Sequence, residues 1–203
     1  MALKSSVTED KTDGRSQRSA RSREKIKAAI VELIRAGDYA PRAIDISEHT
    51  GLSIRTVFRH IDHMESLFRE ISEDIQKVVL SKALKPYASV DWREQLEELM
   101  ARRVEIFEFI TPIRISCSLH RFRSEVLNRE YELAFELERA SLTSILPAEI
   151  ADDASLVNAL NQVLGVSNWI SLRVEQGLSP TDAAVIVRRT VRALLASAEL
   201  GQS

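Results

Sequence analysis

Apolar residues recur at helical spacing along most of the chain. In residues 19–36 the apolar side chains of Ile26, Ile30 and Leu33 fall three or four positions apart, which places them on one face of a helix. The same spacing returns in residues 63–84. We find no run of alternating apolar and polar residues bounded by turn residues, which a half-buried strand would show. The pattern therefore predicts an all-α protein.

Glycines and prolines divide this pattern into segments. Gly37 follows the first helix, Pro86 and Pro147 mark later boundaries, and Thr111-Pro112 restarts the chain. The predicted helices cover residues 19–36, 43–50, 54–60, 63–84, 91–110, 112–122, 124–146 and 152–176, with a last helix capped by Ser179 or Thr181 that ends near residue 200.

The most informative segment, residues 46–67, has the form of two short helices joined by a tight turn. Gly51 stands just past the first helix, where a left-handed residue ends a helix without strain. Ser53 stands at the N-cap of the second helix, where its oxygen accepts a backbone N–H. A DNA-reading helix-turn-helix has this form. An ordinary helical hairpin with a solvated polar face remains the alternative at this point.

The second of these helices carries side chains that can contact nucleic acid. Arg55 is expected to read a base edge, and Arg59 to contact either a base or a phosphate. Phosphate contacts are expected from Ser53, Thr56 and His60. The helix N-terminus adds its own partial positive charge.

With its flanks, the segment resembles the TetR family of transcriptional regulators. The resemblance rests on ISEHTGLSIRTVFRHIDHMESLF at 46–68 and on the amphipathic helix REKIKAAIVELIRAGDY at 23–39. The C-terminal GLSPTDAAVIVRRTVRALL at 177–195 is similar to the closing helix of many members. The resemblance implies a three-helix DNA-binding module and a larger helical domain that binds a small molecule and a second subunit.

Residue by residue, the resemblance implies a set of DNA contacts and a domain layout. The expected DNA-binding residues are Arg42, Ser53, Ile54, Arg55, Thr56, Phe58, Arg59 and His60. Phe58 stands where the family usually has Tyr, so we expect it to pack on a sugar or a thymine methyl group. The expected layout is a disordered basic arm at 1–18, a DNA-binding domain at 19–80 and a ligand-binding and dimerisation domain at 81–203.

The family also implies a repressor that acts as a homodimer on a palindromic, double-stranded operator and is released by a small-molecule effector. We expect dimerisation through residues 154–200, on the stripes formed by Leu156, Leu160, Val163 and Leu164 and by Ala184, Val187, Val191, Leu194 and Leu195. The alternative is that these stripes pack on their own domain. Bulky residues that would line an effector site are Phe107, Phe122, Tyr131, Phe135 and Trp169.

Arg42 and Met64 depart from the family's usual Thr and Lys. These departures keep a second function open, that of a helical adaptor protein that has lost specific DNA binding. We expect no enzyme activity, no catalytic residues, no cofactor and no metal site, because the chain has no His-Glu-x-x-His pattern, no cysteine pair and no glycine-rich phosphate loop.

Charge and cysteine content add to this picture. The net charge is −2, yet residues 15–27 contain six Lys and Arg against the single acidic Glu24. Such an arm either follows DNA phosphates or only solubilises the chain. The single Cys117 excludes an intrachain disulfide. Because no apolar signal or membrane-spanning segment is present, we expect a cytoplasmic protein with no membrane partner.

Overall fold

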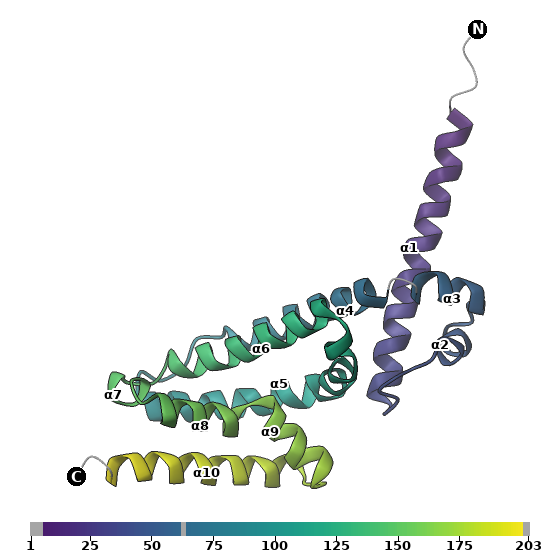
Figure 1. The fold of residues 1–203 in the computed structure, drawn as a ribbon. Helices are drawn as coiled ribbons and strands as arrows, with labels where there is room; N and C mark the ends of the chain where they lie inside the picture. Colours follow the sequence, from purple (N-terminus) through teal and green to yellow (C-terminus); the bar gives the residue numbers. More distant parts are fainter. Residues whose placement is uncertain (1–5, 62–63, 201–203) are drawn as a thin grey trace. The chain divides into compact units, whose positions relative to one another are not determined.

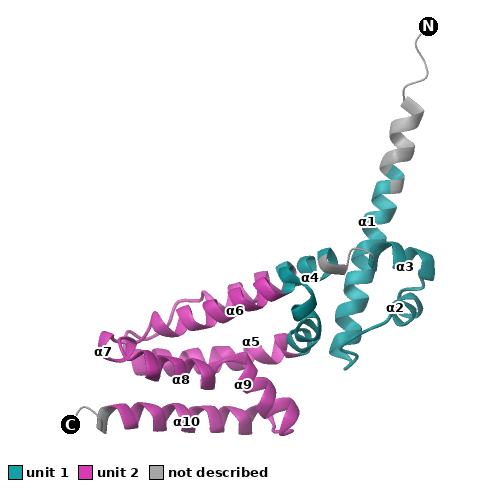
Figure 2. Cartoon of the chain, viewed as in Figure 1, with its two compact units in different colours: residues 1–73, 112–127 teal, residues 74–111, 128–203 magenta. Residues whose placement is uncertain are grey.

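The computed structural model describes residues 6–61 and 64–200 of the chain (Figure 1). These residues form helices, turns and bends and contain no strand, which confirms the prediction of an all-α protein. The chain divides into two compact units, which are coloured separately in Figure 2. Unit 1 comprises residues 1–73 and 112–127, and unit 2 comprises residues 74–111 and 128–203.

These units differ from the predicted domains, which met near residue 80. The helix α4 (Met64–Ala83) contributes to both units, and so does α5 (Trp92–His120). The end of α5 belongs to unit 1, where the rings of Phe68 and His120 lie 5.7 Å apart between centroids. The boundary inside α4, between residues 73 and 74, has no proline or glycine beside it, so the sequence pattern did not reveal it. The boundary inside α5 falls at Pro112, where the sequence pattern predicted the start of a new helix.

Unit 1 is built around α1 (Ser6–Arg35), α2 (Ala43–Thr50), α3 (Ile54–Ile61) and the first half of α4. Apolar residues at helical spacing fill its interior, because each helix turns one face inward. The buried apolar side chains of these helices are Ile26, Ala29, Ile30, Ile34, Ile46, Val57, Leu67, Phe68 and Ile71.

The expected disordered arm at 1–18 is wrong for residues 6–18, which are the first turns of α1. Residues 1–5 lie outside the described residues. The expectation rested on the lack of an apolar stripe before Ile26, but a stripe reports burial rather than helicity. Residues 6–18 contain no proline and only one glycine, Gly14, so nothing in their backbone chemistry opposes a helix.

The remaining elements follow α5 in the chain, and two of their helices are shorter than the predicted helices 124–146 and 152–176. They are the 3-10 turn η1 (Arg121–Arg123), α6 (Glu125–Thr143), α7 (Ala148–Ala151), α8 (Ala154–Leu164), α9 (Val166–Ile170), the π-helical turn η2 (Ser171–Glu175) and α10 (Pro180–Leu200). Within unit 2, α5, α6, α8 and α10 run lengthwise beside one another (Figure 1).

Two predicted helix boundaries are wrong. The chain does not restart at Pro112, because α5 continues through it. An interior proline removes one backbone hydrogen bond and costs about 3 kcal/mol, which burial of Ile106, Phe107 and Ile113 on the same helix offsets. The predicted helix 152–176 is interrupted at Gly165, whose extended backbone separates α8 from α9.

The core of unit 2 contains the stripes that we expected at a dimer interface. Leu156, Leu160 and Leu164 of α8 are buried within the chain, as are Val187 and Val191 of α10. The other stripe residues, Val163, Ala184, Leu194 and Leu195, are partly buried against the same core. The buried members of these stripes therefore pack within their own chain, where α8 and α10 lie against each other. Dimerisation through residues 154–200 stays a prediction.

Candidate functional site

The turn between α2 and α3 has the predicted local geometry. Gly51 is left-handed, with φ +68°, and its N–H donates to the carbonyl of Ser47 at 3.0 Å. The Ser53 Oγ accepts the backbone N–H of Thr56 at 3.3 Å and lies 2.9 Å from its hydroxyl. The Ser47 hydroxyl donates to the carbonyl of Leu52 at 2.6 Å, which braces the turn from within. The predicted roles of Gly51 and Ser53 as helix caps are confirmed.

One face of α3 is open to solvent. Its members are Ile54, Arg55, Phe58 and Arg59, all of which are exposed. Successive residues of a helix are rotated by about 100°, so positions i, i+1, i+4 and i+5 share a face. The Phe58 side chain is 53% exposed, although an aromatic ring of this size is normally covered. The α3 face thus presents two guanidinium groups beside two apolar side chains.

His60 does not belong to this face. It lies three positions after Val57 on the same side of α3, and it is only 7% exposed. A phosphate contact needs an accessible donor, so the prediction that His60 contacts phosphate is wrong. The i+3 relation to a buried valine was visible in the sequence, and it predicts an inward side chain.

Arg42 caps α2 and is held there by Asp45. Its Nε and Nη2 donate to the Asp45 carboxylate, each at 2.9 Å, and its backbone N–H donates to the same group at 2.9 Å. These hydrogen bonds lower the pKa of Asp45 from 3.8 to about 2. The guanidinium remains largely exposed, so it keeps donors that can face a phosphate.

Two cations of the basic segment 15–27 form ion pairs with acidic residues. Arg23 donates to the Glu70 carboxylate from Nε at 3.0 Å and from Nη2 at 2.6 Å, and also to the Ser66 hydroxyl. Lys27 forms ion pairs with Glu70 at 3.5 Å and with Glu24 at 3.1 Å. The Arg23 bonds lower the pKa of Glu70 most strongly. These two cations fasten α1 to α4 and are not the free charges that the segment's composition suggested.

The five aromatic residues expected at an effector site do not converge. Phe107 and Trp169 are buried together, with ring centroids 6.5 Å apart. Phe122 is 80% exposed and belongs to unit 1. Phe135 is 48% exposed, and the Tyr131 hydroxyl lies 3.3 Å from the Ser167 hydroxyl at the surface of unit 2. Only Phe107 and Trp169 therefore share a site.

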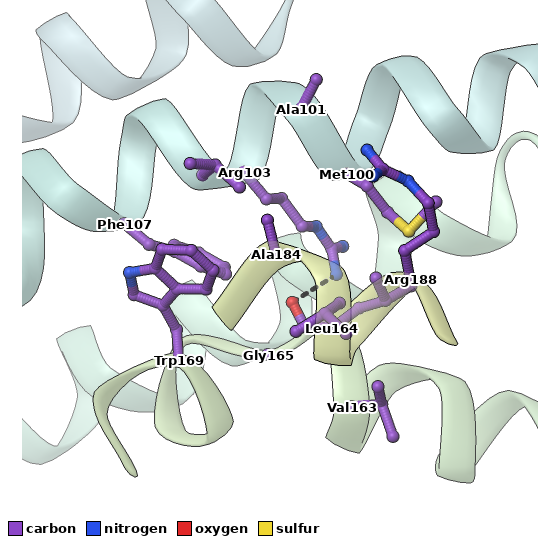
Figure 3. Close-up of a pocket in the computed structure, with 12 residues that line it drawn as sticks. Met100, Ala101, Arg103, Phe107, Val163, Leu164, Gly165, Trp169, Ala184 and Arg188 are labelled. Atoms are coloured by element: carbon purple, nitrogen blue, oxygen red, sulfur yellow. Dashed lines mark hydrogen bonds between the residues drawn. The ribbon is translucent and has the colours of Figure 1, made fainter. Parts of the chain in front are cut away.

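Those two residues border a small cavity in unit 2 (Figure 3). Its volume is about 30 Å³, which is room for about two water molecules. Sites for drug-sized ligands enclose roughly 300–1,000 Å³. The cavity is lined by Met100, Ala101, Arg103, Val104, Phe107, Val163, Leu164, Gly165, Trp169, Ala184, Val187 and Arg188.

Arg103 is a buried cation in the wall of this cavity. Figure 3 shows it directed at the carbonyl of Leu164, to which Nη1 donates at 2.9 Å. Its Nη2 donates to the carbonyl of Glu138 at 2.5 Å and to the Ser141 hydroxyl at 3.0 Å. Burial lowers the pKa of the Arg103 guanidinium, while the Glu138 charge acts in the opposite direction.

Arg103 and Glu138 together stabilise the break between α8 and α9. Arg103 binds the last carbonyl of α8, and the Glu138 carboxylate accepts the first N–H of α9, on Val166, at 3.3 Å. A Cβ at Gly165 would lie 3.0 Å from the carbonyl oxygen of Asn161, so only glycine fits without a shift. None of these three residues was predicted from the sequence to belong to a site. The signals were an arginine at a core-facing position after Leu99 and Met100, and a glycine inside an apolar helix.

A second polar cluster holds Trp169 from the other side. The indole N–H donates to Glu108 Oε1 at 2.8 Å, and Arg173 pairs with both Glu108 oxygens at 2.7 and 3.0 Å. The Arg173 hydrogen bond is the largest cause that lowers the pKa of Glu108. Arg173 also donates to the carbonyl of Leu178, so one side chain joins the π-helical turn to α5 and to the following loop.

Comparisons with protein-family models, with curated proteins and with solved structures found no match for this chain. In the part of the chain that the structure describes, no three His, Cys, Asp or Glu side chains gather as metal ligands would. Within that part, too, every helix is either too short or too polar to cross a membrane.

Proposed function

We propose that this chain is a TetR-like, DNA-binding transcriptional regulator that acts as a repressor. The observation that carries the proposal is the α3 face, where Arg55 and Arg59 stand exposed beside Phe58. Arginine pairs with guanine through two parallel hydrogen bonds, and an exposed aromatic ring can contact a thymine methyl group. The capped turn at Gly51 and Ser53 fixes the direction of α3 relative to α2.

Exposed side chains around the α3 face supply the remaining contacts in this proposal. Thr56 and Ser53 stand at the helix N-terminus, where backbone N–H groups and the helix dipole favour a phosphate. Arg42 adds a phosphate contact from the start of α2. Phosphate contacts set register and base contacts set sequence preference, so we assign the preference to Arg55, Arg59 and Phe58.

A homodimer remains part of the proposal, on a different surface from the one the sequence suggested. The outward face of α10 carries the exposed side chains of Val185 and Ile186 and the small residues Ala193 and Ala196. Pairing of two such faces on a two-fold axis would give a four-helix arrangement with α8. Two α3 helices would then meet half-sites one DNA turn, about 34–36 Å, or a longer spacing apart.

Control by an effector requires a site that grows when it is filled. The cavity beside Trp169 is about ten times too small for a drug-sized molecule. An effector would therefore bind a conformation of unit 2 with a larger cavity. For release from DNA, that conformation must be the one with lower DNA affinity, and DNA must weaken effector binding by the same factor.

The decisive experiment is selection of fragmented genomic DNA on the purified chain at moderate salt, followed by sequencing of the retained fragments. We expect an enriched palindrome. Retention without any enriched sequence would reduce the proposal to non-specific DNA binding. A chain that retains no DNA even at low salt would contradict the proposed function.

Two double variants connect the result to α3. Arg55→Ala with Arg59→Ala should lower affinity for the selected site by at least about fivefold per lost base contact, since such a contact contributes about 1–3 kcal/mol. Lys85→Ala with Arg129→Ala removes the same charge from exposed positions of unit 2 and should leave the preference for the site intact. Equal loss in both variants would show that charge alone, and not the α3 face, governs binding.

An adaptor protein is the second candidate, and one observation favours it. Leu119 and Phe122 are exposed in unit 1, and Arg121 stacks on the Phe122 ring at 4.3 Å. Exposed apolar groups of this size mark protein contacts in many folds. An adaptor would keep its protein partner when Arg55 and Arg59 are replaced, and would lose it on Phe122→Ala.

A further inference from the structure

The middle of α1 carries a stripe of exposed cations, formed by Arg18, Arg21 and Lys25. At 3.6 residues per turn these positions fall within an arc of roughly 60° and span about 10 Å along the helix. The structure gives none of the three an ion pair with any residue that it describes. Residues 16–27 contain one acidic residue, Glu24, and it forms an ion pair with Lys27 at 3.1 Å.

This cationic stripe lies opposite the face of α1 that packs into unit 1. The buried side chains of Ile26 and Ile30 point to the other side of the helix, at roughly 120–160° from the stripe. Arg23 and Lys27, which bind Glu70, also fall on that inner side. The cations of α1 are thus sorted, with two fastening the helix to α4 and three facing solvent.

The first part of the segment that bears the stripe is mostly exposed. Residues 16–18, 20 and 21 are exposed, and Ser19 is half-buried. Within unit 1, α2 and α3 lie beside the C-terminal half of α1, and the N-terminal half continues past them (Figure 1). A helix that is polar all round gains nothing from burial, and its stability comes from side-chain pairs or from what it binds.

We propose that the cationic stripe is a second DNA-contacting surface, which lies along the phosphates that flank the site of α3. The inference rests on the proposed function and adds to it an interaction that does not read sequence. Phosphates of one DNA strand recur every 3.4 Å along the duplex axis, so three cations over about 10 Å can each meet a phosphate.

The contribution of the stripe to DNA affinity can be estimated from the release of counterions from DNA. Each neutralised phosphate contributes about 0.9 to the slope of log affinity against log salt concentration. Three contacts therefore contribute about 2.7. When the salt concentration rises from 50 to 200 mM, the wild type loses the contribution of these three contacts and the variant does not. The ratio of wild-type to variant DNA affinity should therefore fall roughly 40-fold over that range.

The test measures binding of the full chain to a 30-base-pair duplex of arbitrary sequence and to the selected site across that salt range. The stripe variant is Arg18→Gln, Arg21→Gln and Lys25→Gln, in which glutamine keeps helix propensity. A matched control, Lys77→Gln, Lys85→Gln and Arg129→Gln, removes three exposed cations from unit 2. Circular dichroism verifies that the helix content of both variants equals that of the wild type.

We expect the stripe variant to lower the salt slope by two to three per bound protomer on both duplexes while it keeps its preference for the selected site. The control should leave the slope unchanged. A stripe variant with the wild-type slope would overturn the inference while leaving the proposed function standing, provided that the wild type binds its site. A wild-type chain that binds neither duplex would overturn both.

Discussion

Replacement of Arg103 by methionine should strongly destabilise unit 2. The guanidinium is 6% exposed and donates to the carbonyls of Leu164 and Glu138 and to the Ser141 hydroxyl. Methionine matches the length of the aliphatic stem but offers no donor. The variant therefore leaves the end of α8 without its cap and removes a cation that interacts with the Glu138 charge.

The size of the effect is a balance between two large contributions. Hydrogen bonds from a charged donor are worth about 1.5–3 kcal/mol each, and Arg103 makes three. Against this stands the relief of several kcal/mol of desolvation when the buried charge is removed. Because removal of one partner from a buried charged cluster costs about 3–5 kcal/mol, we expect a net loss of about 3 kcal/mol in the free energy of unfolding.

Urea unfolding followed by circular dichroism and tryptophan fluorescence measures this loss. With a slope of about 2–3 kcal/mol per molar, the midpoint should fall by about 1 M or more. Arg188→Met is the matched control, since Arg188 pairs with Glu97 at the surface and such pairs contribute at most about 1 kcal/mol. If the Arg103→Met protein is as stable as the wild type, this prediction is wrong. The desolvation free energy of the buried guanidinium would then equal the free energy that its hydrogen bonds contribute.

Three further predictions concern the predicted DNA-binding residues and their supports. Gly51→Ala places a side chain at φ +68° and should cost about 1–2 kcal/mol by urea unfolding, whereas Gly51→Asn should cost less. The pKa of Asp45, lowered from 3.8 to about 2, should appear in a carboxyl NMR titration. Because the folded value is the lower one, the cap stabilises the fold above pH 3.8 and is lost as the pH falls through 2; Arg42→Gln should bring the pKa back toward 3.8. Phe58→Ala should leave the unfolding midpoint unchanged, since the ring is half exposed. Its affinity for the selected site should fall roughly fivefold, the equivalent of about 1 kcal/mol of ring burial, and an unchanged affinity would remove Phe58 from the proposed contacts.

Local features of the proposed DNA-binding face followed from neighbouring residues. Gly51 had to follow a helix end, and Ser53 had to precede a helix start, because backbone sterics and capping act within four positions. The exposure of Arg55, Phe58 and Arg59 follows from the same periodicity. That periodicity also placed His60 inside, but its imidazole chemistry misled the assignment. Residue type shows what a side chain can do, whereas helix phase decides whether it can reach a partner.

The sequence by itself determined the helical class, the caps around α3 and the inner face of α1, because each depends on spacing along one segment. Tertiary structure alone decided which helix covers which stripe. The leucines of α8 and the valines of α10 fit either a second subunit or each other, and apolar surface is not selective about its partner. The break at Gly165 depends on Arg103 and Glu138, which lie 62 and 27 positions before it in the chain. No local pattern encodes such contacts, because they form only after distant helices have packed.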